Sequence, residues 1–204
     1  MKLIGMLDSP YVRRAVISLR MLGLKFEHQS LSVFSTYTEF QRINPVVKAP
    51  TLVCDDGTYL MDSTLIIEYA EALAQPHSLM SSNIRDKQYE LHIVGLALAA
   101  CEKSVQIIYE RNLRPSEKQH QPWVARVTEQ LLAAYSALEV AITQHPLASP
   151  DAAMGQAGIS TAVAWYFTQK MLPEIVRASD FPNLVAYSKA AEALPVFLAA
   201  PHGD

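Results

Sequence analysis

The sequence predicts an α/β domain followed by an all-helical domain. Up to about residue 74, short apolar runs typical of strands alternate with segments of helical periodicity. After a polar, proline-containing stretch at residues 75–83, only helical periodicity remains. Of the 204 residues, 50% are hydrophobic, which is enough for a substantial core in one large domain or two small ones.

The chain opens with a predicted strand-helix-strand unit. The apolar run Lys2–Leu7 predicts a buried strand, and a second strand is expected near Phe26–Leu31. Between them, apolar residues at helical spacing predict a helix over Pro10–Leu22, which ends because Gly23 favours the left-handed conformation that follows many helices. Such a connection usually makes the two strands parallel neighbours.

The start of this helix is a candidate anion site. Asp8 and Ser9 are good N-cap residues, and Pro10 suits the first helical position, where its missing N–H would have no partner. Ser9 is therefore expected at the positive end of the helix dipole. The face opposite the apolar positions is predicted to carry Arg13, Arg14 and Arg20.

A helix, two strands and a further helix are predicted next. Thr36–Ile43 predicts a short helix, which ends at Asn44 because a residue before proline avoids the α region. Thr51–Cys54 and Thr58–Met61, joined by a turn at 55–57, predict an antiparallel hairpin. The helix that starts near Ser63 is expected to direct these apolar side chains inward: Leu65, Ile66, Tyr69, Ala70 and Leu73.

The rest of the chain is predicted to be helical. Long helices are expected near Ile84–Arg111 and Trp123–Gln144, and shorter ones near Ser160–Leu172 and Asn183–Leu194. Proline-containing breaks separate them, which is typical of antiparallel neighbours. We therefore predict one domain over residues 1–76 and a second over residues 84–204.

Composition limits the classes of binding partner and the cellular location that are expected for this chain. The net charge of -3 and the lack of a basic run argue against nucleic acid or an anionic membrane, and leave a small neutral or anionic ligand open. Cys54 and Cys101 form no C-x-x-C pair, and the 6 histidines lack the spacing of a metal site, so no metal is expected. No signal sequence or bilayer-spanning segment is recognised, so a cytoplasmic location is expected.

Several motifs resemble those of the cytosolic glutathione S-transferases. Ser9–Arg14 resembles the S-P-[FY]-[VA]-R-[RK] catalytic turn of bacterial, serine-type members. Residues 44–50 resemble the loop that carries the family's cis-proline, here Pro50, and residues 61–63 resemble its [ED]-S glutathione signature. Residues 180–197 resemble the family's C-terminal [YF]-P-N-L…R-P-x-F pattern, so the resemblance covers nearly the whole chain.

This resemblance implies a fold, a function and an assembly. Residues 1–76 would form a thioredoxin-like βαβ-αββα domain that binds glutathione, and residues 84–204 an all-helical domain that forms the electrophile pocket. The family also implies a cytoplasmic homodimer with a role in detoxification. One departure concerns the family's S/T-x-x-D capping box, for which Ser160 is the expected cap while Val163 replaces the aspartate.

Ser9 is the candidate catalytic residue. A free thiol titrates near about 8.5, and a hydroxyl that donates to the sulfur would favour the reactive thiolate of glutathione. Ser9 would then stabilise an anion and need no neighbouring base, unlike the nucleophilic serine of a triad. The alternative is a plain N-cap serine, the commonest role for serine at such a position.

A second set of residues is expected to bind glutathione. By the family resemblance, a cis Ala49–Pro50 bond would direct the Ala49 backbone toward the cysteinyl residue, and Lys48 would meet the glycyl carboxylate. Asp62 and Ser63 precede a helix whose free N–H groups suit the γ-glutamyl carboxylate, while the Asp62 carboxylate could pair with the ammonium or a backbone N–H. The alternatives are a solvated Lys48 and a helix cap formed by Asp62 or Ser63.

The electrophile pocket is expected between the two domains. Its candidates are Tyr11, Tyr109 and Tyr166, with Trp165 as a further one, although aromatic residues at helical spacing are core more often than pocket. The sequence does not indicate the natural electrophile.

Two classes of function stay open. The first is an enzyme, most simply a glutathione transferase, with a glutathione-dependent isomerase, dehalogenase or peroxidase as alternatives that share the thiolate. The second is a non-catalytic binding or regulatory protein that keeps the same architecture. A mixed disulfide cannot form at Ser9, which argues against a thiol-disulfide reductase.

Overall fold

The computed structural model describes residues 1–150 and 154–203, which form two compact units. The first unit contains Met1–Leu79 together with the C-terminal segment from Ala193, and the second contains Met80–Glu192. The first unit has the predicted βαβ and αββα order, and the described part of the second is helical. The sequence analysis assigned all of 84–204 to the helical domain, whereas the structure joins the segment from Ala193 to the first unit.

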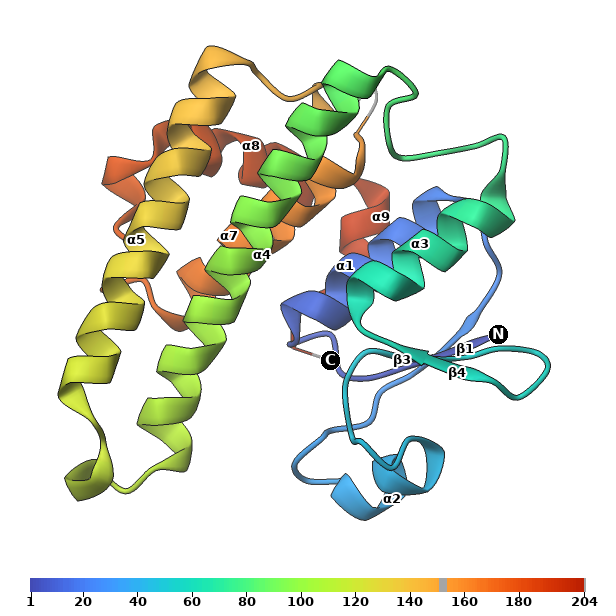
Figure 1. The fold of residues 1–204 in the computed structure, drawn as a ribbon, viewed down its shortest axis with the longest axis horizontal. Coiled ribbons are helices and arrows are strands. Elements are labelled where there is room, and N and C mark those ends of the chain that lie inside the picture. Colours follow the sequence, from blue (N-terminus) through green and yellow to red (C-terminus); the bar gives the residue numbers. More distant parts are fainter. Residues whose placement is uncertain (151–153, 204) are drawn as a thin grey trace. The chain divides into compact units, whose positions relative to one another are not determined.

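A four-stranded mixed sheet forms the centre of the first unit (Figure 1). Its strands are β1 (Lys2–Ile4), β2 (Glu27–Gln29), β3 (Thr51–Val53) and β4 (Tyr59–Met61), in the order β2-β1-β3-β4. β1 and β2 are parallel, and β3 is antiparallel to both β1 and β4. The predicted strand-helix-strand unit and hairpin are confirmed, although each strand is shorter than expected.

Helices lie on both sides of this sheet. Figure 1 shows α1 (Pro10–Met21) and α3 (Ser63–Ala74) side by side on one side, and α2 (Tyr37–Ile43) on the other. Phe40 of α2 belongs to a buried cluster with Ile4 of β1, which holds this helix to the sheet. Gly23 follows α1 with a φ of 73°, so the expected left-handed stop is confirmed.

The inward face of α3 differs from the prediction. Leu65, Tyr69 and Leu73 were expected inside but are 56%, 37% and 46% exposed. The buried apolar side chains of this helix are Ile66, Ile67 and Ala70. The expectation was wrong for the three exposed residues because α3 carries apolar side chains on two sides, and helical spacing alone does not tell which side meets α1.

The C-terminal segment packs on α1 through a short helix, α9 (Pro195–Leu198). Arg13 Nε donates to the Ala200 carbonyl over 2.8 Å, and the guanidinium lies 5.6 Å from the centre of the Phe197 ring. Arg13 is buried, so the expected charged outer face of α1 is wrong at this position. The C-terminal segment thus supplies partners that a buried arginine requires.

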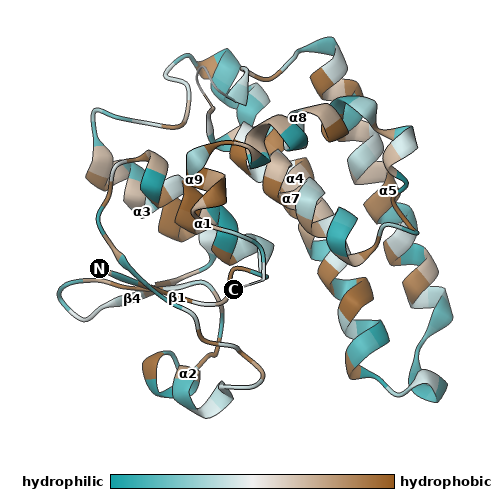
Figure 2. Ribbon diagram, turned by 180° about the vertical axis from the view of Figure 1, so that it is seen from behind, coloured by the Kyte–Doolittle hydropathy of each residue, from teal (hydrophilic) through white to brown (hydrophobic). Residues whose placement is uncertain are grey.

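Long helices build the second unit. α4 (Ile84–Leu113) packs against α5 (Gln121–Gln144) and α7 (Gln156–Met171), and α7 packs against α8 (Pro182–Glu192). Short 3-10 turns, η1 (Ser116–Lys118) and η2 (Ala178–Asp180), lie in the connections. Figure 2 shows hydrophobic residues along α4 and α7, whose mutual contact forms the middle of this unit.

Three aromatic rings and a hydroxyl network occupy the core of the second unit. Tyr135 packs edge-on against Trp165 at a centroid distance of 5.3 Å, and Trp165 packs against Phe181 at 5.7 Å. The Thr168 hydroxyl bonds to the hydroxyls of Tyr135 at 2.7 Å and Ser104 at 2.8 Å. Trp165 is therefore a core residue, and its candidacy for the electrophile pocket is wrong.

α7 begins before its predicted cap. Gly155 is the N-cap residue, and Ser160 lies buried inside the helix. The prediction that Ser160 caps this helix is therefore wrong, and Val163 does not occupy a capping position. A side chain at Gly158, the third helical position, would collide with the Tyr187 hydroxyl. The tyrosine of α8 thus fills the space in which the second residue of a capping box would lie.

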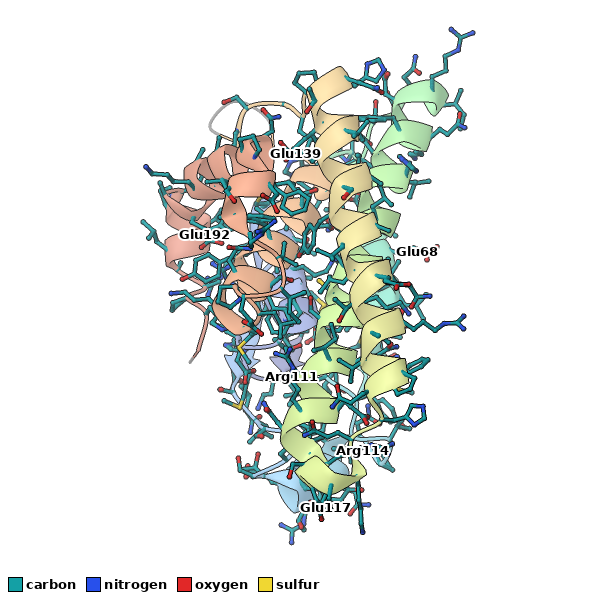
Figure 3. All side chains as sticks on the ribbon, turned by 90° about the vertical axis from the view of Figure 1, so that its left-hand side faces the viewer. Glu68, Arg111, Arg114, Glu117, Glu139 and Glu192 are labelled. Atoms are coloured by element: carbon teal, nitrogen blue, oxygen red, sulfur yellow. The ribbon has the colours of Figure 1, made fainter. Side chains whose placement is uncertain are left out.

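Glu139 of α5, labelled in Figure 3, caps the neighbouring helix α8. Its carboxylate accepts hydrogen bonds from the Asn183 amide over 2.8 Å and from the Leu184 amide over 3.0 Å. First-turn amides have no partner inside their own helix, so this carboxylate fixes the start of α8 against α5.

One helix meets the length and composition criteria for a membrane span, contrary to the expectation above. Among the described residues it is α4, with a mean hydropathy of 1.4 over its most apolar window. The core helix of a water-soluble protein satisfies the same criteria, and α4 packs against α5 and α7 within the second unit.

Candidate functional site

Ser9 lies at the N-terminus of α1. Its backbone is extended, and the Val12 amide donates to its hydroxyl oxygen over 3.4 Å. A hydroxyl oxygen that accepts one hydrogen bond can still donate its own proton. The capping role and the anion-binding role, which the sequence left as alternatives, are therefore compatible at this residue. No acidic side chain lies in the first turn, so none there offsets the positive potential that the helix dipole creates at this end.

Gly5 allows the loop before β3 to approach α1. It has a φ of 140°, and a Cβ at this position would lie 2.6 Å from Val12 Cγ2 and 3.2 Å from Ala49 Cβ. Both the backbone conformation and the limited space favour glycine. Ala49 thus lies beside the first turn of α1, which Ser9 caps. The sequence analysis missed Gly5, for which the available signal was a glycine inside the predicted strand Lys2–Leu7.

A buried amide holds the loop that leads to Pro50. The Ala49–Pro50 bond is cis, as the resemblance implied. Asn44 Nδ2 donates to the Thr51 hydroxyl over 2.8 Å, and this hydroxyl donates to the Lys48 carbonyl over 2.7 Å. Within residues 1–150 and 154–203, the backbone N–H and carbonyl of Ala49 have no hydrogen-bond partner. The loop therefore presents a short open backbone edge beside α1.

Asp62 caps α3. Its φ is 73°, and its Oδ1 accepts a hydrogen bond from the Thr64 amide over 2.9 Å. Its Oδ2 lies 3.4 Å from Lys48 Nζ, and both side chains are about half exposed. The structure thus brings two of the predicted glutathione-binding residues together. An exposed ion pair of this kind contributes about 0–1 kcal/mol, so a charged ligand can displace either partner at little cost.

The surroundings of Asp62 keep its carboxylate ionised. Burial raises the pKa of Asp62, but hydrogen bonds from the Thr64 amide and Lys48, with the positive charges of Lys48 and Arg14, outweigh burial and lower the pKa below the ordinary 3.8. At neutral pH this side chain is an anion and can accept from an ammonium group.

Arg14 is a site residue that the sequence analysis missed. It is only 2% exposed, and its Nη1 donates to the hydroxyls of Ser63 over 3.0 Å and Thr64 over 3.2 Å. The expectation of an outer charged face is therefore wrong here too. The available signal in the sequence was the run Ala15–Leu19, which is apolar except for Ser18 and therefore indicates a helix buried on all sides. The structure buries this whole run, and a helix buried on all sides must pair any charge it carries.

The remaining candidate site residues are three tyrosines. Tyr11 is half-buried in the first turn of α1. Tyr109 of α4 is partly exposed, and the ring of Tyr166 in α7 lies 5.3 Å from Lys170 Nζ. Their assignment to an electrophile pocket stays a prediction. In the described part of the chain, no group of three or more His, Cys, Asp or Glu side chains could hold a metal ion.

Comparison with known sequences links the chain to glutathione S-transferases. Residues 3–78 match the family profile described as glutathione S-transferase, N-terminal domain. The uncharacterized GST-like protein YibF of Escherichia coli is 25% identical over 185 residues, which cover 91% of this chain and 90% of that protein. Glutathione transferase GST 23 of Zea mays is 33% identical over 70 residues, or 34% of this chain and 32% of that protein.

Comparison with solved structures gives the same result. A glutathione transferase family member from Pseudomonas fluorescens with bound glutathione is 26% identical, with a TM-score of 0.84 and coverage of 98% of this chain and 97% of that chain. A glutathione S-transferase from Methylobacterium radiotolerans in complex with glutathione sulfonate shares the fold, with a TM-score of 0.90, 23% identity and coverage of 100% and 95%. The profile match over residues 3–78, the similar proteins and the shared fold all link the chain to the glutathione S-transferase family.

Proposed function

We propose that the protein is a glutathione transferase that stabilises the glutathione thiolate and transfers it to an electrophilic, mostly hydrophobic small molecule. The observation that carries this proposal is the arrangement within the first unit. Ser9 caps α1, the cis-proline loop approaches the same helix at Gly5, and Asp62 caps α3. The bound glutathione of the Pseudomonas fluorescens relative supports glutathione as the co-substrate. No metal is required.

Ser9 is proposed as the catalytic residue. Donation of its O–H to the sulfur is a hydrogen bond to a charged group, worth about 1.5–3 kcal/mol, and the α1 N-terminus adds about 0.3–1 kcal/mol. At about 1.4 kcal/mol per unit, these contributions lower the thiol pKa from about 8.5 by roughly one to three units. The thiol proton passes to solvent. The thiolate then bonds to the electrophilic carbon, and the leaving group departs with its bonding electron pair.

The glutathione backbone is proposed to bind against two segments, the loop before β3 and the turn at Asp62 that precedes α3. The open edge of Ala49, next to Pro50, suits the cysteinyl residue. The γ-glutamyl ammonium would pair with Asp62, and its carboxylate with the first-turn donors that begin at Ser63. Lys48 would exchange its exposed bond to Asp62 for the glycyl carboxylate.

The remaining assignments follow the family resemblance. Tyr11, Tyr109 and Tyr166 are proposed for the electrophile pocket. A cytoplasmic location, a role in detoxification and a homodimer are proposed on the same ground. The identity of the electrophile distinguishes conjugation from isomerase, dehalogenase or peroxidase chemistry, because all of these use the same thiolate.

The variant Ser9→Ala tests the proposed chemistry. We expect its conjugation rate with an aromatic halide to fall by roughly 10- to 100-fold, because the charged hydrogen bond is lost, and its glutathione affinity to change less than about threefold. Ser9→Thr, which keeps the hydroxyl and the cap, is the matched control and should retain most of the rate. The pH dependence of the rate should shift toward higher pH in Ser9→Ala only.

Two results would contradict this assignment. If affinity collapses while the rate per bound complex is unchanged, Ser9 is a binding residue. If the unmodified protein neither binds immobilised glutathione nor turns over any electrophile in a panel, the non-catalytic binding or regulatory protein becomes the better account.

A further inference from the structure

A cavity of about 530 Å³ lies in the second unit, where α4 ends and α5 begins. Its volume is within the range of about 300–1,000 Å³ that is typical of small-molecule sites. The cavity is lined by Glu110, Arg114, His120, Pro122, Trp123 and Arg126. Figure 3 labels Arg114 at this end of the two helices. None of these residues was assigned to the glutathione site or to the electrophile pocket.

The carboxylate in the cavity wall is buried and already paired. The Glu110 side chain is 8% exposed, and its Oε2 lies 3.0 Å from Arg114 Nε. Its Oε1 accepts a hydrogen bond from the His120 backbone amide over 2.8 Å. Both oxygens of this carboxylate are therefore used, and they hold the end of α4 to the start of α5. The terminal Nη groups of Arg114, whose side chain is 58% exposed, remain as donors in the cavity wall.

The other polar and aromatic groups of the cavity are open. Two guanidinium groups and one paired carboxylate leave the cavity wall with an excess of positive charge. Arg126 forms no hydrogen bond or ion pair with any residue of 1–150 or 154–203. Trp123 is 41% exposed. An unpaired cation and an open aromatic face in one cavity suit an anion that is attached to a planar ring.

A phosphate fits these donors better than a carboxylate does. One bidentate guanidinium is enough for a carboxylate, whereas a phosphate monoester has three terminal oxygens and a charge of about −1.5 to −2 at neutral pH. Arg114, Arg126 and a ring N–H of His120 supply donors from three positions. We propose that this cavity binds a phosphate monoester of a planar aromatic group, such as a nucleoside monophosphate, with the phosphate on the two arginines and the ring on Trp123.

Titration calorimetry with adenosine monophosphate (AMP) tests this site in the unmodified protein. We expect one AMP per chain, with a dissociation constant below about 1 mM. Adenosine, which lacks the phosphate, and inorganic phosphate, which lacks the ring, should each bind at least about tenfold more weakly. AMP should quench the tryptophan fluorescence, because Trp123 is exposed while Trp165 is buried. Added glutathione should not displace AMP.

Arg126→Gln is the decisive variant, because Arg126 has no partner in the described residues whose loss would disturb the fold. Its AMP affinity should fall by about tenfold or more, toward that of adenosine. Arg85→Gln is the matched control, since it removes the same charge from an exposed position roughly 40 Å away along α4. This control should keep its AMP affinity within about twofold.

Two further comparisons test the ring and the phosphate separately. Trp123→Leu should weaken AMP by about tenfold and leave the weak binding of inorganic phosphate unchanged. Phenyl phosphate should bind more tightly than benzoate, which carries a carboxylate on the same ring. Equal binding of these two compounds would refute the assignment to a phosphate.

The inference is overturned if AMP does not bind at about 1 mM, if adenosine binds as tightly as AMP, or if Arg126→Gln and Arg85→Gln have equal effects. Displacement of AMP by glutathione, with no effect of Arg126→Gln, would place AMP in the glutathione site and overturn it as well. The proposed transferase function stands in each case, because the cavity shares no residue with the proposed glutathione site.

Discussion

Asp62 combines a helix cap with a charge, and the two can be separated. Asparagine caps helices as well as aspartate does and tolerates positive φ, here 73°. Asp62→Asn should therefore keep the bond from the Thr64 amide and lose only the interactions of the charge. Because the side chain is about half exposed, we expect a loss of less than about 1 kcal/mol in the free energy of unfolding at neutral pH.

The difference in the free energy of unfolding between the wild type and Asp62→Asn should depend on pH with a definite sign. The folded-state pKa of Asp62 lies below the ordinary 3.8, so its charge stabilises the fold above that value and loses its effect as pH falls through the folded-state pKa. Urea unfolding of the wild type and Asp62→Asn should differ by a constant amount from pH 7 to about pH 5 and converge at lower pH. A difference that grows on acidification would contradict the assigned pKa direction.

The same variant should bind glutathione more weakly, by about tenfold or more, because a charged partner of the ammonium is replaced by a neutral one. Its conjugation rate at saturating glutathione should remain near that of the wild type. This outcome would separate Asp62, which is proposed to bind glutathione, from Ser9, which is proposed to act on the sulfur.

Helix ends and turns that depend on one residue and its neighbours could be predicted from the sequence. Gly23 and Asn44-Pro45 end the first two helices where expected, and Asp55–Gly57 turns the predicted hairpin. These signals are local, because each depends on the conformational limits of a residue and its neighbours. The cis Ala49–Pro50 bond was predictable only through the family resemblance.

The features that were not predicted depend on tertiary contacts. The burial of Arg13 requires the C-terminal segment, and the burial of Arg14 requires the hydroxyls of α3, both far away in sequence. The start of α7 was placed at Ser160 because a serine suggests a cap, whereas Gly155 begins the helix and Tyr187 fills the space beside it. Sequence periodicity contains no information on such partners.

The short helix α9 anchors the C-terminal segment through one side chain. Phe197 is fully buried under the Arg13 guanidinium, while its neighbour Leu198 is 65% exposed. Phe197→Ala should lower the free energy of unfolding by about 3–5 kcal/mol, and Leu198→Ala should change it by less than about 0.5 kcal/mol. Denaturant unfolding measures both. Equal effects of the two variants would show that α9 does not depend on the Phe197 contact.

The division into units also shows how the chain ends are used. The first unit is built from both ends of the described chain, since β1 and α1 come from one and α9 from the other. Arg13 and Arg20 of α1 both donate to backbone carbonyls of the C-terminal segment. The helix that Ser9 caps is therefore held by residues 179 and 187 positions later in the sequence, and loss of that segment should affect the site.

The exposed stripe on α3 bears on the proposed homodimer. Leu65, Tyr69 and Leu73 recur every four residues and stay largely open to solvent. A row of large apolar side chains on one helix is typical of an interface, and a closed dimer places the same patch of each copy in contact with the other. The family resemblance points to a second copy of this chain as the occupant.

Leu65→Glu tests this assembly, because a buried unpaired carboxylate would oppose association. In sedimentation equilibrium we expect the wild type to have twice the chain mass and Leu65→Glu to shift toward the 22.6 kDa monomer. Val140→Glu is the matched control, because Val140 of α5 is also apolar and is exposed to a similar degree as Leu65; this variant should leave the mass unchanged. A monomeric wild type would refute the homodimer, and a dimeric Leu65→Glu would place the interface away from α3.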